Sequence, residues 1–226
     1  MTAPLIVLSG EAGAGKDSVA KILVEKHGWE LFSLSAPMKR FAEDMFGFSK
    51  EQLYGPSSAR NAPDPRWARP CPNCGATGLV THRNTGDPTP CPDCQSGKIN
   101  DNSARRILQL MGEEFLRQMI HIDALTMRAR PELEALLNRP TCKGIVVNDA
   151  RHDNDRNNLH NWLGAHRVDV RAPNKKADGA EWRKHVSELS RPVDADLEFI
   201  INNDEQWPFH GLSDLVTAML SAFGIS

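Results

Sequence analysis

Short runs of hydrophobic residues alternate along the chain with longer segments in which hydrophobic residues recur every three or four positions. The short runs are typical of buried strands, and the longer segments are typical of amphipathic helices. This alternation predicts an α/β fold of three layers, in which helices cover both faces of a central parallel sheet. The predicted strands are Leu5–Leu8, Leu31–Leu34, Gly144–Asn148, Arg167–Val170 and Leu197–Ile201. The predicted helices are Lys16–Lys26, Pro37–Phe46, Ala104–Ile120, Ala124–Leu137, Asp153–Leu163, Ala180–Leu189 and Gly211–Phe223.

The alternation is interrupted between residues 55 and 101. This segment is rich in Pro, Gly, Asn, Arg and Cys, and neither helical nor strand periodicity continues in it for any length. A segment of this composition cannot build a hydrophobic core of its own, so we expect a bound metal to fold it. We therefore predict a core domain formed by residues 1–54 and 102–226, with a small zinc-ribbon insertion at residues 55–101.

Four of the five cysteines lie in the predicted insertion, in two C-x-x-C pairs with sixteen residues between them. This spacing is typical of a structural zinc site, because four thiolates around one Zn²⁺ leave no position open for a substrate. Two disulfides are the alternative, which a reducing cytosol disfavours. The pairs resemble the zinc-binding repeats of the DnaJ-type chaperone central domain, with Ala76 and Ser96 in place of glycines. The predicted metal ligands are Cys71, Cys74, Cys91 and Cys94.

Composition and charge narrow the range of partners. Of 226 residues, 25% are charged and 40% are hydrophobic, which is ordinary for a globular domain with an insertion. The net charge of −2 and the aromatic content of 6% argue against broad capture of nucleic acid or of an anionic membrane. We therefore expect the insertion to stabilise the protein, although contact with a protein or nucleic acid is the alternative. No secretory signal or membrane-spanning stretch is visible, so we expect a cytoplasmic protein.

The most specific motif follows the first predicted strand. Residues Gly10–Lys16 read G-x-x-x-x-G-K and lead into a predicted helix, which is the context that a phosphate-binding loop requires. Glycines allow successive backbone N–H groups to point at phosphate oxygens, and the helix N-terminus and Lys16 add positive charge. We expect a nucleoside triphosphate site here rather than a simple glycine-rich turn. The predicted ATP-binding residues are Gly10, Gly13, Ala14, Gly15, Lys16, Asp17 and Ser18.

Asp17 occupies the position at which such loops usually carry a Ser or Thr that binds Mg²⁺. A carboxylate is also a hard oxygen ligand for this ion, and Ser18 offers a hydroxyl one position later. Equally, Asp17 fits the first turn of a helix, where the helix dipole favours negative charge. The sequence leaves both interpretations open.

Two clusters of polar residues point to a second substrate. Ser35 and Lys39 follow the second predicted strand and place a hydroxyl and a cation where that strand opens into a helix. Arg105 and Gln109 are four residues apart on one predicted helix, so they share a face. A guanidinium binds phosphate and an amide reads a base edge, so this pair is suited to a nucleotide. A solvated charged helix face would show the same pattern.

A third cluster, Asp149 and Arg151, directly follows the predicted strand Gly144–Asn148. Because ligands of parallel α/β sheets bind at the carboxyl ends of the strands, we expect this carboxylate and this guanidinium at the ligand edge. The carboxylate could orient Mg²⁺ through water, and the guanidinium could bind a phosphate. In the alternative interpretation, Asp149 caps the next helix and pairs with Arg151.

The order of these motifs resembles that of the bacteriophage-type deoxynucleoside monophosphate kinases, over nearly the whole chain outside the insertion. The matching residues are Gly15-Lys16-Asp17-Ser18, Pro37-Met38-Lys39, Arg105, Leu108, Gln109, Gly112, Arg117, Asp149, Arg151, His185-Val186-Ser187-Glu188 and Ile200-Ile201-Asn202-Asn203-Asp204. An Asp after the loop lysine is part of the family pattern. Glu113 stands where the family commonly has Thr, and Leu125 where it often has Trp, so the base preference stays open. The zinc insertion is not a general feature of the family.

The resemblance implies transfer of the γ-phosphoryl group of ATP to the 5′-phosphate of a deoxynucleoside monophosphate, with Mg²⁺ as cofactor. The residues implied in catalysis are Lys16, Asp17, Arg151 and Arg171. The residues implied in substrate binding are Ser35, Lys39, Arg105, Gln109, Arg117, Asp149, Arg151 and Arg183, the last from a lid. A homodimer is compatible with the sequence. The alternatives are a P-loop kinase with a non-nucleotide phosphorylated acceptor and a nucleic-acid-binding NTPase that uses the zinc ribbon.

Overall fold

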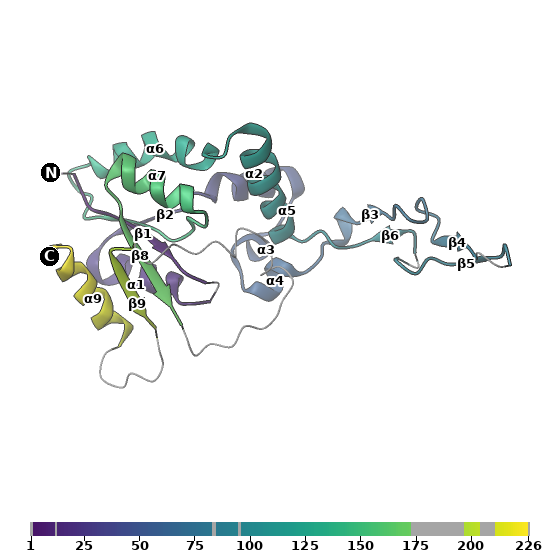
Figure 1. The fold of residues 1–226 in the computed structure, drawn as a ribbon, viewed down its shortest axis with the longest axis horizontal. Helices are drawn as coiled ribbons and strands as arrows, with labels where there is room; N and C mark the ends of the chain where they lie inside the picture. Colours follow the sequence, from purple (N-terminus) through teal and green to yellow (C-terminus); the bar gives the residue numbers. More distant parts are fainter. Residues whose placement is uncertain are drawn as a thin grey trace. The chain divides into compact units, whose positions relative to one another are not determined.

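Five parallel strands form the central sheet, in the order β2-β7-β1-β8-β9 (Figure 1). The computed structural model describes residues 2–11, 13–82, 85–94, 96–172, 197–203 and 211–225. The chain divides into two compact units, which we call the sheet unit (Met1–Pro37 with Glu113–Ser226) and the cysteine unit (Met38–Gly112). The five strands belong to the sheet unit. They are β1 (Leu5–Ser9), β2 (Glu30–Phe32), β7 (Ile145–Val147), β8 (His166–Arg171) and β9 (Phe199–Asn202).

Alternate residues of the strands supply two separate hydrophobic cores. Ile6 and Leu8 of β1 face one core, with α1 (Lys16–His27) and α9 (Leu212–Ala222) packed against it. Leu5 and Val7 face the opposite core, beneath α6 (Ala124–Leu137) and α7 (Asp153–Leu163). Each fully buried aliphatic side chain stabilises the fold by about 1.5–3 kcal/mol. The predicted three-layer α/β class is therefore confirmed, and helices lie on both faces of the sheet in Figure 1.

The predicted elements in the described residues are present, with ends that differ by at most two positions. One prediction was wrong in kind: the continuous α-helix expected over Ala104–Ile120 is an α-helix, α5 (Ala104–Leu110), followed by a π-helix, η2 (Met111–Ile120). Because a π-helix pairs residues five apart, the 3.6-residue periodicity used for the prediction does not hold beyond Leu110. The helix predicted over Ala180–Leu189 lies outside the described residues.

The cysteine unit has a small core of its own. Most of α2 (Ala36–Phe46) packs here with α5 and two further helices, α3 (Lys50–Tyr54) and α4 (Ser57–Asn61). The fully or nearly fully buried residues of this core are Ala42, Phe48, Leu53 and Ala104. A 3₁₀ turn, η1 (Pro65–Trp67), leads into the cysteine-rich part.

Two antiparallel ladders build that cysteine-rich part. Strand β3 (Arg69–Pro70) pairs with β6 (Lys98–Ile99), and β4 (Leu79–Thr81) pairs with β5 (Pro88–Pro90). The segment predicted to lack regular structure, residues 55–101, thus contains short elements whose length is below what a periodicity argument detects. The predicted domain boundaries at residues 54/55 and 101/102 stay a prediction. No helix in the part of the chain that the structure describes is long and apolar enough to cross a membrane.

Candidate active site and cysteine cluster

The loop after β1 has the backbone of a phosphate-binding loop. Gly10, Gly13 and Gly15 have φ angles of 127°, 82° and 110°, in the region that side chains disfavour. A Cβ at Gly10 would lie 2.2 Å from the carbonyl oxygen of Val170 in the neighbouring strand β8. A Cβ at Gly15 would lie 2.4 Å from the Nδ2 atom of Asn203. Glycine is therefore required at both positions by the backbone conformation and by close neighbours.

Lys16 and the start of α1 supply the positive charge of this loop. The Lys16 Nζ atom donates hydrogen bonds to the carbonyl oxygens of Gly10 (2.6 Å) and Glu11 (2.8 Å), so its ammonium lies across the loop. The N-cap of α1 is Gly15, and no side chain of the described residues caps the N-terminus of this helix. The first backbone N–H groups of α1 are therefore available to bind an anion such as a phosphate.

Asn203, which directly follows β9, holds the phosphate loop in place. No role for this residue was predicted from the sequence. Its Nδ2 atom donates to the carbonyl oxygen of Ala14 (2.9 Å), and its backbone N–H donates to Arg171 O (2.7 Å). One residue therefore ties the phosphate loop to the carboxyl end of β8. The available signal was the pair of polar residues that follows the last predicted strand, of which Asn203 is the second.

Asp17 lies beside Asn148, at the carboxyl end of β7. The Asn148 Nδ2 atom donates to Asp17 Oδ1 (2.7 Å), which orients this carboxylate. Asp17 and Ser18 are both exposed in the first turn of α1, so their oxygens are accessible to a hydrated ion. This donor set of carboxylate and hydroxyl oxygens fits Mg²⁺. Asn148 was not singled out from the sequence, where it reads as the last residue of a strand.

The Asp149 carboxylate is held by the turn that follows β2. It accepts four hydrogen bonds, from the Ser33 hydroxyl (2.6 Å), the Leu34 N–H (2.9 Å), the Ser35 N–H (3.0 Å) and the Ser35 hydroxyl (2.7 Å). The carboxylate thus joins the ends of β2 and β7. The N-cap of α7 is His152, so the alternative that Asp149 caps this helix is wrong.

The backbone around Arg151 is fixed by a buried arginine, Arg156. This side chain is 3% exposed, and its Nη1 atom donates to the carbonyl oxygens of Ala150 (3.1 Å) and Arg151 (2.9 Å). The half-buried Arg151 therefore follows β7 on a rigid segment. Arg156 was missed in the sequence, where it reads as one charged residue of an amphipathic helix.

Arg171 is oriented by Asp169, two positions earlier in β8 and therefore on the same face of the strand. Its Nε atom donates to Asp169 Oδ2 (2.8 Å). The hydroxyl of Ser9 in β1 contacts the other carboxylate oxygen, at 3.0 Å. Arg171 thus lies at the carboxyl end of the strand that adjoins β1. The lid candidate Arg183 and the matching residues His185–Glu188 lie outside the described residues.

Arg117 forms a buried ion pair in the sheet unit. Its Nη2 atom lies 2.6 Å from Asp155 Oδ2, with exposed side-chain fractions of 5% and 1%, and its Nη1 atom donates to Ile122 O (2.8 Å). Burial raises the pKa of Asp155 above its ordinary value, against the opposing effect of the guanidinium. Much of the hydrogen-bonding capacity of Arg117 is therefore directed into the protein. Its predicted role in substrate binding stays a prediction.

The remaining predicted substrate-binding residues lie in the cysteine unit. Arg105 is 8% exposed, which excludes the solvated-face alternative for this residue, and its Nη2 atom lies 3.4 Å from the Ser57 hydroxyl. The buried Gln109 Nε2 atom has no hydrogen-bond partner among the described residues. A buried amide without a partner is costly, and a ligand acceptor atom would satisfy it. The Lys39 ammonium lies 4.7 Å from the centre of the Tyr54 ring.

The four predicted metal ligands come together in one cluster. The Sγ atoms of Cys71, Cys74, Cys91 and Cys94 all lie within 4.8 Å of one another. The Cys71–Cys91 and Cys74–Cys94 sulfur distances are 3.9 and 3.5 Å, and all four cysteines are free. A tetrahedral Zn²⁺ with bonds of about 2.3 Å separates its sulfurs by about 3.8 Å. The disulfide alternative does not fit, because bonded sulfurs lie about 2.05 Å apart.

Backbone N–H groups support the thiolates. Gly78 N–H donates to Cys74 Sγ and Gly97 N–H donates to Cys94 Sγ, each at 3.3 Å. Burial opposes ionisation of Cys74, but the hydrogen bonds from Gly78 and the neighbouring thiols lower its pKa to about 7. Burial and the neighbouring thiols raise the pKa of Cys94 to about 12. The thiols thus compete for protons, and a divalent cation in place of those protons would relieve the competition.

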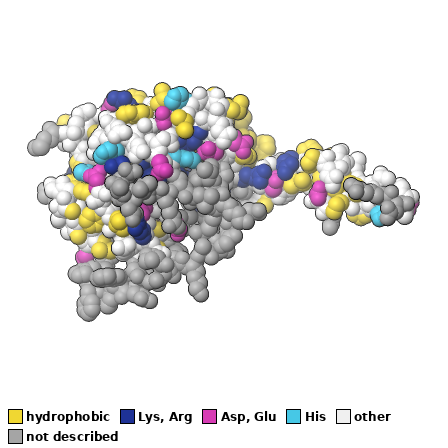
Figure 2. Space-filling view, viewed as in Figure 1, with side chains coloured by type: hydrophobic (Ala, Val, Ile, Leu, Met, Phe, Trp, Pro, Cys, Tyr) yellow, Lys and Arg dark blue, Asp and Glu magenta, His cyan; other side chains and the backbone are white. Residues whose placement is uncertain are grey.

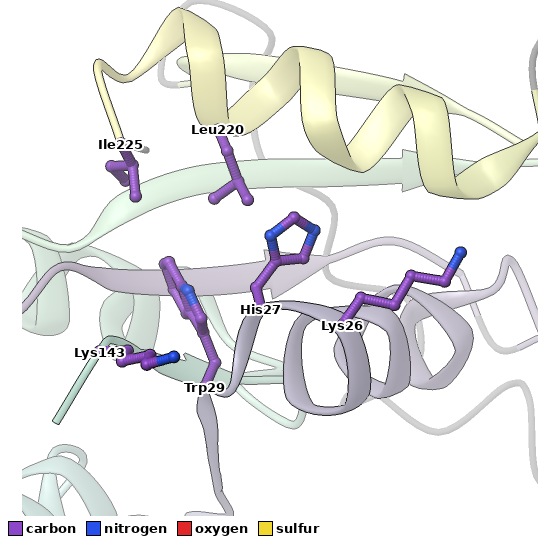
Figure 3. A pocket seen from close by; sticks show the side chains of 6 residues that line it. All are labelled: Lys26, His27, Trp29, Lys143, Leu220 and Ile225. Carbon is purple, nitrogen blue, oxygen red and sulfur yellow. The ribbon is translucent and has the colours of Figure 1, made fainter. Parts of the chain in front are cut away.

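A cavity of 510 Å³ lies elsewhere in the sheet unit, beside the C-terminal end of α1 and against α9 (Figure 3). Figure 3 shows Trp29 between Lys143 and His27, with Leu220 and Ile225 facing them from the α9 side. Because the phosphate loop precedes the N-terminal end of α1, this cavity is separate from it. None of the predicted site residues that the structure describes lines the cavity.

Comparisons with known proteins give distant similarities. The chain is 23% identical over 207 residues to a protein of Acanthamoeba polyphaga mimivirus that bears the provisional name deoxynucleotide monophosphate kinase, with 88% of each chain covered. A crystal structure from Thermus thermophilus is similar with a TM-score of 0.47 and 14% identity, covering 99% of this chain and 98% of that one. A sugar kinase from Janibacter sp. HTCC2649 has a TM-score of 0.40 and 13% identity, covering 99% and 96%.

A gluconokinase from Sinorhizobium meliloti 1021 has a TM-score of 0.39 and 13% identity, covering 99% of this chain and 92% of that one. No family model matches the chain. The viral relative is named as a kinase.

Proposed function

We propose that the protein transfers the γ-phosphoryl group of ATP to the 5′-phosphate of a deoxynucleoside monophosphate, which yields ADP and the diphosphate. One observation carries the proposal: the adjacent strands β7, β1 and β8 each lead into a cationic residue. These residues are Arg151, Lys16 and Arg171. Three cations at one sheet edge match a reaction that must hold two phosphate groups against their mutual repulsion.

The phosphate loop is assigned to the ATP. The backbone N–H groups of the loop would bind the donor phosphates together with the Lys16 ammonium, which lies across the loop. Mg²⁺, held by Asp17 and Ser18, would neutralise charge on these phosphates. An oxygen of the acceptor phosphate attacks the γ-phosphorus, and the bond from that phosphorus to the β–γ bridging oxygen breaks, so ADP leaves with that oxygen. Arg171, oriented by Asp169, would stabilise the transferring group.

The acceptor nucleotide is assigned to residues by their chemistry alone. Arg151 and Arg105 would bind its phosphate, and Gln109 would bind its base or sugar through the Nε2 atom that lacks a partner. Asp149 and Ser35 would act chiefly by fixing the turn after β2, since their hydrogen bonds are made to each other. Lys39, Arg117 and the lid residue Arg183 complete the proposed set. The preference for a deoxynucleotide rests on the family resemblance and on the name of the viral relative.

We also propose that the cysteine cluster binds one structural Zn²⁺. The sulfur distances and the two N–H donors support a closed site, because four thiolates fill the tetrahedral coordination of Zn²⁺. A structural zinc, a soluble nucleotide substrate and the lack of a membrane-spanning helix among the described residues are consistent with a cytoplasmic enzyme.

The test is ADP formation from ATP and Mg²⁺ with each deoxynucleoside monophosphate, each ribonucleoside monophosphate, a panel of phosphorylated non-nucleotide metabolites, nucleic acid, and water alone. Turnover that requires a deoxynucleotide acceptor supports the proposal and reveals the base preference. Turnover only with a phosphorylated non-nucleotide contradicts it in favour of a metabolite kinase. Turnover without an acceptor, or only with nucleic acid, contradicts it in favour of an NTPase. The Lys16→Ala variant, purified in parallel, controls for contaminating kinases.

A further inference from the structure

The cysteine-rich part of the cysteine unit is fastened at its base to the start of α5. The two chain segments that enter and leave it run antiparallel, with a bridge between Pro63 and Ser103 and a ladder between β3 and β6. Asp64 N–H donates to Asn102 O (2.8 Å), and Asn102 Nδ2 donates to Trp67 O (2.8 Å). Ser103 is also the N-cap of α5, since its hydroxyl accepts a hydrogen bond from Arg106 N–H (3.2 Å). The base therefore ends in the first turn of the helix that carries Arg105.

Asp101 is the charged link in this base. Its carboxylate accepts hydrogen bonds from Arg69 Nη2 (3.0 Å) and Nε (3.3 Å), and it lies 3.5 Å from Arg106 Nη1. Arg69 belongs to β3 and Arg106 to the first turn of α5. The hydrogen bond from Arg69 lowers the pKa of Asp101, so this carboxylate is charged at neutral pH. Figure 2 shows positive and negative side chains adjoining one another at the base of the cysteine-rich part.

The cysteine cluster closes the other end of the same ladder. Cys71 directly follows β3, and its N–H donates to Gly97 O (2.9 Å), directly before β6. Among the residues that the structure describes, Val80 and Ile99 are the two besides the thiols that pack against this cluster, and both are partly buried. So little apolar burial cannot hold the ladder, and a metal bound by the thiols would supply the missing stability. The order of β3 and β6 thus depends on the metal at one end and on Asp101 at the other.

We propose that Asp101 is a positioning residue that transmits the metal-dependent order of the cysteine segment (Cys71–Gly97) to the first turn of α5, and so sets Arg105 for the acceptor phosphate. The proposal rests on the function proposed above and extends it to the role of the insertion. With β3 ordered, Arg69 holds Asp101 and Asp101 holds Arg106, next to Arg105 in the chain. Without that order, the first turn of α5 loses this support and retains the Ser103 cap.

Steady-state kinetics of Asp101→Asn test the proposal. We expect the KM for the acceptor nucleotide to rise roughly two- to thirtyfold, the range seen when a supporting contact is removed, while the KM for ATP stays within about twofold. Asp87→Asn is the matched control, because Asp87 is an exposed carboxylate in the same segment and its side chain has no hydrogen bond or ion pair among the described residues. Equal effects on both KM values, or no change in the acceptor KM, would overturn the proposal.

Amide hydrogen exchange and zinc content provide the second readout. Asp101→Asn should keep its zinc but exchange faster in the first turn of α5, whereas Cys91→Ser should lose zinc and exchange faster both there and in the cysteine segment. Faster exchange in α5 with an unchanged acceptor KM would mean a purely structural link and would overturn the proposal. If the wild-type protein uses no nucleotide acceptor, the proposed function fails separately. The exchange measurement still decides whether Asp101 connects the metal to α5.

Discussion

The phosphate loop and the cysteine segment both depend on glycines with positive φ, but they are held in place by different forces. Gly10 and Gly15 of the phosphate loop are backed by Val170 in β8 and by Asn203 directly after β9, and both strands contribute fully buried side chains, such as Val170 and Ile201, to the core. Gly97 of the cysteine segment instead lies against the carbonyl oxygen of Ala76, which would be 2.2 Å from a Cβ at Gly97. Around it, the described core consists of the thiols with the partly buried Val80 and Ile99. One site is rigid because a hydrophobic core surrounds it, and the other needs a ligand to become rigid.

This difference indicates how each region should respond when a substitution removes one of its polar contacts. The phosphate loop rests on two apolar cores, so removing a polar group from it should affect chemistry and leave the fold intact. The cysteine segment has ladders of two or three residues and a few polar links, so removing one link should affect folding first.

Metal removal should have the largest effect. Structural zinc contributes on the order of 10–16 kcal/mol in small zinc domains, so a mercurial that titrates the thiols should abolish hydrogen-exchange protection over residues 71–99. Protection of β1 and α1 should not change. Elemental analysis should find one zinc per chain, which Cys91→Ser loses and Cys142→Ser keeps, because Cys142 lies outside the cluster. Zinc retained by Cys91→Ser would refute the closed four-thiolate site.

Asp155→Ala should destabilise the sheet unit by about 3–5 kcal/mol, because it leaves the buried Arg117 guanidinium without its carboxylate. Asp155→Asn should cost less, since burial already raises the pKa of this carboxyl and disfavours its charge. The control is Glu132→Ala, which removes an exposed pair with Arg128 and should cost at most about 0.5 kcal/mol. Urea denaturation measures all three, and equal losses for Asp155 and Glu132 would contradict the assignment.

Lys16→Ala should lower kcat by about 10²–10³-fold, the effect of losing one preorganised charge at the transferring group. The melting temperature should stay close to that of the wild type, because the Lys16 hydrogen bonds described above are made to carbonyl oxygens of its own loop. Lys21→Ala is the control, since Lys21 is an exposed lysine of the same helix that pairs only loosely with Glu25, at 3.7 Å. A folded Lys16→Ala variant with full turnover would remove the loop from the mechanism.

Asp64→Asn should destabilise the cysteine unit by about 1–3 kcal/mol at pH 7, since Asp64 is 4% exposed and accepts hydrogen bonds from Arg66 and Gln52. Arg66 holds the pKa of Asp64 far below its usual range. A depressed pKa stabilises the fold above the unfolded value of about 3.9, and this contribution is lost as the pH falls further. The difference in melting temperature between Asp64→Asn and the wild type should therefore shrink as the pH falls from about 4 to about 2. A constant difference would contradict the charged role.

Ala76→Gly should give the smallest effect, and it should be stabilising. Ala76 has a φ of 70°, the one positive φ outside glycine among the described residues, and this conformation costs an alanine about 1 kcal/mol. The control is Ala68→Gly, whose φ of −62° is ordinary, so this change should destabilise by about 0.5–1 kcal/mol. Competition with a zinc chelator measures both. Weaker zinc binding by Ala76→Gly would argue against backbone strain at Ala76.

Local patterns predicted the elements that local forces form. The strands could be found because buried parallel strands are runs of hydrophobic residues, and the phosphate loop because its glycines and lysine are adjacent in the chain. The cysteine cluster could be found because each C-x-x-C pair is itself a local turn. The short helices α3 and α4 escaped prediction because five residues carry too little periodicity, and the π-helix because it breaks the 3.6-residue repeat.

The chain's order of residues thus specifies the layers, the phosphate loop and the thiol set, all of which depend on spacings of a few residues. The partners that orient the site are a matter of tertiary structure. Asn203 reaches Ala14 across 189 positions of sequence, and Ser33 reaches Asp149 across 116. Such contacts arise only when the strands adopt the order β2-β7-β1-β8-β9, which brings distant strand ends to one edge. A side chain that positions another residue carries no signal in its own neighbourhood, so only the folded chain identifies it.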